Sequence, residues 1–246
     1  MVRSGLQEPE HDWQTPRVSP YRLAAHLVSA FTIYSGLVWT ALDLSRPKPL
    51  LAAAETLGHI HGRAIRSRML PLSLLVAITA TSGAFVAGMD AGRAYNTFPL
   101  MGGRLIPEEY WSDTLPVLRN MFENTPAVQF HHRVLATLTT TAVLLLWPMV
   151  RRSAAPPGIK RSMDLVLGVT AAQFALGIWT LLEYVPVHLG SLHQANALNL
   201  FTAVLITLHT LRPPSMGPIS FLLGRFGAPV AALGILSVGW GVTAQY

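Results

Sequence analysis

The chain has 246 residues, of which 51% are hydrophobic and only 12% are charged, and its formal net charge is +6. Because soluble domains usually carry about 25% charged residues, this composition excludes an ordinary soluble enzyme and a disordered chain. The absence of cysteine excludes disulfides, thiolate-bound metals and thiol nucleophiles. The basic residues lie mostly in short segments between apolar blocks, which is typical of a membrane protein and not of a nucleic-acid-binding one.

The apolar blocks predict an all-α polytopic membrane bundle with five or six transmembrane helices. A spanning helix needs roughly 20 mostly apolar residues. Five blocks satisfy this, and they cover residues 21–43, 69–89, 130–150, 163–184 and 192–211. A sixth apolar stretch, residues 219–243, is interrupted by Arg225 and Pro229, so it fits a sixth span and a non-spanning tail equally well.

The segments between the helices predict the orientation. Residues 44–68 and 151–161 are basic, whereas the long segment 90–129 contains more acidic than basic residues. The positive-inside rule places the two basic segments on the inner side and residues 1–20 and 90–129 on the outer side. Turn-forming and aromatic residues predict that segment 90–129 is an ordered cap. Residues 1–6 are followed by no apolar stretch of a signal peptide, and they do not resemble a transit peptide.

Three histidines, His26, His132 and His193, lie within the first turn or two of the first, third and fifth predicted helices. These helices run in the same direction, so we expect the three side chains at a similar depth near the outer side. An ionisable residue inside a membrane helix is costly and indicates a function. Two imidazoles that face each other in a bundle can supply both axial ligands of a heme iron. The alternative for each histidine is an interfacial position, half in water.

The other histidines give weaker indications. His131 lies about 100° from His132 around the helix, so only one of them can face a given partner. We expect His209 to be an interface residue at the inner end of its helix, and His59 and His61 to be solvated in the basic segment.

The polar neighbours of the candidate ligands have two interpretations each. Arg133 can pair with a heme propionate or anchor the start of the helix. Gln129 and Gln194 can hydrogen-bond the ligand imidazoles or satisfy helix ends.

A set of motifs in fixed order resembles the heme A synthase family, in its mitochondrial-type branch. The matching residues are YRLAAHL at 21–27, SGAFVAGMDAG at 82–92, YN at 95–96, FP at 98–99, MG at 101–102, IPE at 106–108, RNMFEN at 119–124, VQFHHR at 128–133, LGI at 176–178, YVP at 184–186 and HQ at 193–194. The likeness covers residues 1–212. The family usually has aspartate where this chain has His131, so the ligand role is carried to His132.

This resemblance implies eight helices in two four-helix halves, each with a pair of histidines. His132 and His193, with Arg133 beside them, would hold a heme b cofactor, and His26 would contact the iron of the substrate, heme O. The implied activity is an oxidoreductase reaction in which a ring methyl of heme O becomes the formyl group of heme A, needed for cytochrome oxidase assembly. The implied location is the mitochondrial inner membrane, with a bacterial inner membrane as the alternative. The implied partners are a ferredoxin-type electron donor, membrane lipid, and a heme O synthase or a second copy of the chain.

The resemblance also predicts the domain organisation. Residues 1–20 would be an outer loop, 21–43 the last helix of the substrate half, 44–68 an inner loop, 69–212 the heme b half with cap 90–129, and 213–246 a tail. The family's first three helices have no counterpart in this sequence. This leaves open an incomplete sequence, a truncated relative and a second polypeptide that completes the site, with activity of the chain alone in question.

Three other functions fit parts of the sequence. A b-type cytochrome electron carrier would use His193 and His209 for two stacked hemes, although the partner histidines at both depths are missing. A non-catalytic membrane assembly subunit would bind no heme. A transporter is disfavoured by the lack of paired acidic residues within the predicted spans.

Overall fold

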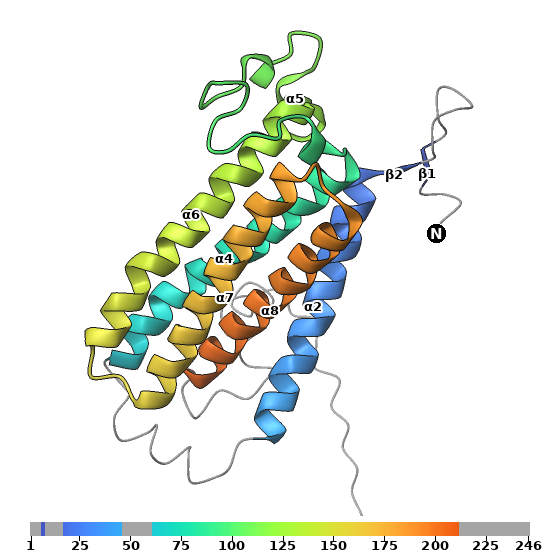
Figure 1. The fold of residues 1–246 in the computed structure, drawn as a ribbon. Coiled ribbons are helices and arrows are strands. Elements are labelled where there is room, and N and C mark those ends of the chain that lie inside the picture. Colours follow the sequence, from blue (N-terminus) through green and yellow to red (C-terminus); the bar gives the residue numbers. More distant parts are fainter. Residues whose placement is uncertain (1–5, 8–16, 46–60, 212–246) are drawn as a thin grey trace, which may run out of the picture.

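Five long helices lie side by side in the computed structural model, which describes residues 6–7, 17–45 and 61–211 (Figure 1). They are α2 (Pro20–Leu44), α4 (His61–Gly88), α6 (Thr125–Arg152), α7 (Pro157–Leu182) and α8 (Val187–Thr210). Helices α4, α6, α7 and α8 form a closed ring, because each packs against the next and α8 returns to α4. Helix α2 lies against α4 and α8. The predicted all-α bundle is confirmed, and residues 219–243 lie outside the described part.

Within the described part, four helices are long and apolar enough to cross a membrane by length and composition. They are α2, α6 and α7 in full and Gly62–Gly88 of α4. Helix α8 is the fifth predicted span. Its outer half contains polar residues such as His193, Asn196 and Asn199, but at 24 residues it is about 36 Å long and packs along α7. The described helices therefore make the chain a multi-pass membrane protein, with α8 as part of the ring although it is not among these four.

Local sequence explains where several helices begin and end. Prolines lie in the first turn of α2, α6 and α7, where the missing N–H has no helical partner. Helix α4 begins at His61, eight residues before the predicted apolar block that starts at Met69. Ile65 and Met69 are both buried one turn apart, so the buried face of the helix extends beyond the block toward the inner side. At its other end, a Cβ atom on Gly88 would lie 2.9 Å from the Cα atom of Pro20, so only glycine permits this contact between α4 and α2.

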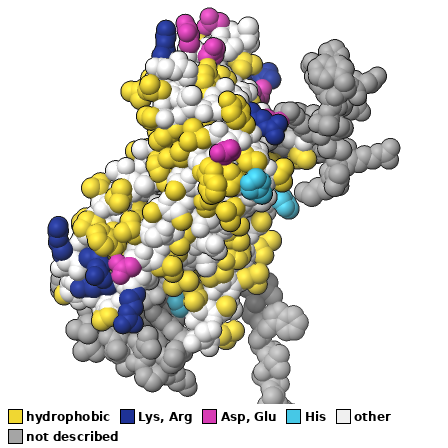
Figure 2. Space-filling model, viewed as in Figure 1, with side chains coloured by type: hydrophobic (Ala, Val, Ile, Leu, Met, Phe, Trp, Pro, Cys, Tyr) yellow, Lys and Arg dark blue, Asp and Glu magenta, His cyan; other side chains and the backbone are white. Residues whose placement is uncertain are grey.

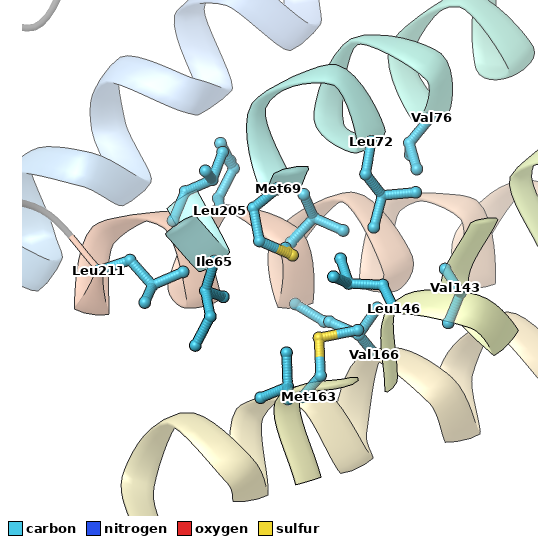
Figure 3. Close-up of a cluster of buried hydrophobic side chains, with 14 of the residues drawn as sticks. Ile65, Met69, Leu72, Val76, Val143, Leu146, Met163, Val166, Leu205 and Leu211 are labelled. Carbon is cyan, nitrogen blue, oxygen red and sulfur yellow. The ribbon is translucent and has the colours of Figure 1, made fainter. Parts of the chain in front are cut away.

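The apolar core occupies the inner half of the ring (Figure 3). Met69 of α4, Val143 of α6, Met163 and Val166 of α7 and Val204 of α8 are completely buried there. Each of the four ring helices thus contributes to one continuous contact, which fixes their relative rotation.

The connecting segment between α4 and α6 folds into an ordered cap over the outer end of the bundle (Figure 1). It contains two short 3-10 helices, Ala91–Arg93 and Glu108–Tyr110, and helix α5 (Val117–Glu123). The buried side chain of Asn120 accepts a hydrogen bond from the Ser112 amide and donates to the carbonyls of Ser112 and Leu115. One amide side chain therefore closes the loop that precedes α5.

The surface charges agree with the predicted orientation. Acidic side chains gather over the cap, and a group of Lys and Arg side chains lies at the opposite end, with hydrophobic side chains between them (Figure 2). Two strands of two residues each, β1 (Leu6–Gln7) and β2 (Arg17–Val18), pair antiparallel beside the start of α2 (Figure 1).

Candidate functional site

His132 and His193 lie at the same depth in the outer half of the bundle. His132 lies seven residues after the start of α6, and His193 lies six residues after the start of α8. At 1.5 Å per residue, both are about 10 Å below the outer ends of their helices. The structure therefore places at one depth the two histidines that the sequence analysis paired.

A glycine on the preceding helix makes room for each of these imidazoles. A Cβ atom on Gly83 of α4 would lie 3.2 Å from Cε1 of His132, and one on Gly177 of α7 would lie 3.0 Å from Cε1 of His193. Gly83 and Gly177 both lie five residues before the last residue of their helices. The two helix pairs, α4 with α6 and α7 with α8, therefore repeat one arrangement of glycine against histidine.

Two polar side chains that the sequence analysis missed contact the imidazoles. Ser82 Oγ lies 2.7 Å from Nδ1 of His132. The amide Nε2 of Gln173 lies 3.2 Å from Nδ1 of His193, and its Oε1 accepts a hydrogen bond from Asn196. In the sequence, the two glycines could have indicated these residues. Ser82 directly precedes Gly83 on α4, and Gln173 lies one turn before Gly177 on α7.

The glutamines proposed from the sequence have other positions. Gln129 is buried and donates a hydrogen bond to the carbonyl of Tyr95 in the cap, and Gln194 is exposed. Both residues are next to or near a candidate ligand in sequence, but helix rotation turns them away from the imidazoles.

The structure does not bring His26 to the other two histidines, because its side chain is exposed on α2. His131 lies 3.0 Å from the hydroxyl of Tyr110 in the cap, so of the adjacent pair only His132 enters the bundle. His188 is exposed, and His59 lies outside the described residues.

His209 differs from its expectation as an interface residue. It is 3% exposed, and its Nε2 lies 2.8 Å from Oδ1 of Asp43 on α2, with the ring of Trp39 edge-on to it. The sequence analysis could not anticipate this burial, since the partner comes from a helix that lies 166 residues earlier in the chain.

Arg133 holds the cap against α6. Its guanidinium donates to the carbonyls of Thr97 and Tyr95, at 2.8 and 2.7 Å. The remaining nitrogen, Nε, is buried without a hydrogen-bond partner in the structure. This anchoring matches one of the two expected roles, and pairing with a propionate stays a prediction.

Tyr21 and Arg119 converge on Glu123 where α2 meets the cap. Glu123 accepts hydrogen bonds from Arg119 Nε at 2.7 Å and from the Tyr21 hydroxyl at 3.0 Å. The hydrogen bond from Arg119 lowers the pKa of Glu123 below its ordinary value, and the Tyr21 bond adds to this. The carboxylate thus links α5 to the first turn of α2.

Acidification should weaken this link. The folded-state pKa of Glu123 is lowered, so its contribution to stability is complete above the ordinary glutamate pKa of about 4.3 and is lost as the pH falls through the lower folded value. We expect the difference in thermal unfolding temperature between the unmodified protein and Glu123→Gln to shrink as the pH falls below about 4. A difference that stays constant over this range in thermal scans would contradict the assignment.

The residues around His132 and His193 fit a heme iron rather than a bare metal ion. The described ranges contain no group of three or more His, Asp or Glu arranged to hold a bare metal ion. A heme needs only two axial protein ligands, which two imidazoles from facing helices can supply. Gly83 and Gly177 carry no side chain that would occupy the space of the imidazoles. The buried Nε of Arg133 is a hydrogen-bond donor that could bind a carboxylate.

Comparison with known proteins identifies the family. The family model for the cytochrome oxidase assembly protein COX15-CtaA matches residues 1–205. The heme A synthase COX15 of Arabidopsis thaliana is 54% identical over 216 residues, which are 87% of this chain and 46% of that protein. The human heme A synthase COX15 is 43% identical over 216 residues, covering 86% of this chain and 50% of that protein.

A heme A synthase–mitochondrial ferredoxin fusion protein of Schizosaccharomyces pombe is 39% identical over 241 residues, covering 87% of this chain and 38% of that protein. This chain therefore spans about half the length of the curated relatives that it matches. No solved structure matches it significantly. The family match over most of the chain and the identities to these relatives show that it belongs to the COX15-CtaA family of cytochrome oxidase assembly proteins.

Proposed function

We propose that this chain forms the heme b-binding part of a heme A synthase, an oxidoreductase that converts a ring methyl of heme O into the formyl group of heme A. The observation that carries the proposal is the pair His132 and His193, which lie at one depth and are each seated against a glycine of the preceding helix. The family match and the names of the relatives support it.

In this proposal His132 and His193 would hold heme b by their imidazoles. The chemistry that a heme held by two histidines would supply is one-electron transfer. Arg133 lies next to His132 at the outer end of α6, and its free Nε would donate to a propionate while its other nitrogens keep hold of the cap.

His26 is proposed to contact the substrate, heme O. Its depth on α2 equals that of the other two histidines, since it lies six residues after Pro20. Its exposure on α2 leaves the imidazole available to a group bound outside the four-helix ring. Helix α2 would then lie between the substrate and heme b, and both would lie near the outer side of the membrane.

The proposed electron donor is a ferredoxin-type protein, and the proposed location is the mitochondrial inner membrane. One relative is named as a fusion with mitochondrial ferredoxin, which supports such a donor. Contacts with membrane lipid follow from the exposed apolar surface, and contacts with a heme O synthase or a second copy remain part of the proposal.

A spectroscopic comparison of three histidine variants tests the heme assignment. We expect about one b-type heme per chain in the unmodified protein, measured by the reduced-minus-oxidised spectrum and the pyridine hemochrome, and its loss in His132→Ala and His193→Ala. His188→Ala is the matched control, because this exposed histidine of α8 should be replaceable without loss of heme. Heme retained in both ligand variants, or no heme in the unmodified chain under heme-replete expression, would contradict the proposal.

The structure speaks against the two-heme cytochrome alternative. That function needs His209 as a ligand, but its Nε2 is bonded to Asp43 in a buried contact between α8 and α2. A non-catalytic assembly subunit predicts no bound heme, so the same spectrum separates it from the proposed function.

A further inference from the structure

The hydrogen bonds around His132 determine which of its ring nitrogens carries the proton. Ser82 has a single hydroxyl hydrogen, and it donates this hydrogen to the carbonyl of Thr79 at 2.7 Å. The same Oγ lies 2.7 Å from Nδ1 of His132, so at this contact it acts as the acceptor. With its hydrogen on the Thr79 carbonyl, Ser82 Oγ faces Nδ1 with a lone pair, which makes Nδ1 the protonated nitrogen.

Gly83 makes room for the imidazole at the same place. A Cβ atom there would lie 3.2 Å from Cε1 of His132, which is bonded to both ring nitrogens, so the glycine leaves space beside Nδ1 and Nε2 alike. With the proton on Nδ1, Nε2 keeps its lone pair and can bind a metal.

The environment of His193 differs from that of His132 at this point. It has the equivalent glycine, Gly177. However, its polar side-chain neighbour is the amide Nε2 of Gln173, which lies 3.2 Å from Nδ1 and 3.3 Å from Nε2 of His193 and whose Oε1 accepts a hydrogen bond from Asn196. An amide N–H only donates, so Gln173 cannot act as Ser82 does, as an acceptor for a ring proton.

We propose that Ser82 is a positioning residue that holds His132 in the Nδ1–H tautomer and thereby presents Nε2 to the heme iron. This inference rests on the proposed function, because it assigns the nitrogen by which the proposed ligand binds. A hydrogen-bond acceptor on the far ring nitrogen of a metal-bound histidine fixes its tautomer and raises its basicity. Consequently the two proposed ligands are inequivalent, because only His132 has a side-chain acceptor on its ring.

The tautomer can be measured on the full chain without heme. In ¹⁵N-histidine-labelled protein at a pH where the imidazoles are neutral, we expect His132, assigned by comparison with His132→Ala, to show the Nδ1–H tautomer. Ser82→Ala should shift it toward Nε2–H, and Ser82→Thr, which keeps a hydroxyl, should restore Nδ1–H. Ser73→Ala is the matched control, since Ser73 lies on the same helix and its hydroxyl also bonds the carbonyl three residues earlier.

A second readout uses the heme-loaded protein. Transfer of heme to an apo-heme-protein acceptor should be about 10- to 100-fold faster from Ser82→Ala than from the unmodified protein or Ser73→Ala. The heme reduction potential of Ser82→Ala should also shift to a more positive value, because a less basic imidazole favours ferric iron less.

The outcomes separate this inference from the proposed function. An Nε2–H tautomer of His132 in the unmodified protein, or equal behaviour of Ser82→Ala and Ser73→Ala, would overturn the role of Ser82 while leaving heme binding intact. If the unmodified chain shows the Nδ1–H tautomer but binds no heme, the role of Ser82 in fixing the tautomer is supported and the proposed function fails.

Discussion

Gly177→Val should leave the protein without bound heme. A Cβ atom at this position would lie 3.0 Å from Cε1 of His193, and the two further methyl groups of valine would fill the space of the imidazole. Forcing extra carbon atoms into a packed site costs typically about 1–3 kcal/mol. Turning the His193 ring away from α7 relieves the collision, so the variant would lose one of the two proposed ligands. The pyridine hemochrome of the purified variant measures the loss.

The control for this variant lies on the same helix. A Cβ atom on Gly168 of α7 would meet nothing within 4 Å, so Gly168→Val should keep its heme. Gly83→Val should behave as Gly177→Val does, through His132. Full heme content in both Gly83→Val and Gly177→Val would show that the glycines do not make room for the ligands.

Met163→Ala should strongly destabilise the bundle. The Met163 side chain is completely buried between α7 and the other ring helices, among Met69, Leu146 and Val166 (Figure 3). Truncating a buried Met to Ala costs typically about 2–5 kcal/mol, because it removes packing contacts and leaves a cavity. Denaturant unfolding in detergent micelles, followed by helical circular dichroism, should give a reduced free energy of unfolding.

Leu165→Ala is the matched control for the core variant. Leu165 lies two residues from Met163 on the same helix, but it is 49% exposed. A substitution at such a position changes the free energy of unfolding by about 0.5 kcal/mol or less. Equal destabilisation by the two variants would place the core elsewhere than in the inner half of the ring.

Much of the helical framework follows from sequence alone, because the length of an apolar block determines whether a helix can cross the bilayer. The block at residues 130–150 lies inside α6, and the prolines and charged residues that flank it mark its ends within a few positions. The inner start of α4 was less accessible to this reasoning. Helical residues such as Arg66 extend beyond the apolar block, and their hydropathy does not distinguish helix from loop.

The depth of the histidines was also predictable, whereas the direction of their side chains was not. A fixed rise of 1.5 Å per residue places His26, His132 and His193 at one level once the helix starts are known. Rotation about each helix axis depends on which neighbours pack against it. For this reason His26 is exposed and His132 enters the bundle, although both lie near the start of a parallel helix.

The sequence by itself thus determined the class of protein, the position of the long helices and the level of the candidate ligands along them, because these depend on composition, length and order along the chain. Only the tertiary structure decided which groups meet across helices: Ser82 with His132, Gln173 with His193, Asp43 with His209. Such pairs join residues with no local pattern in common, and helix packing alone brings them within hydrogen-bonding distance.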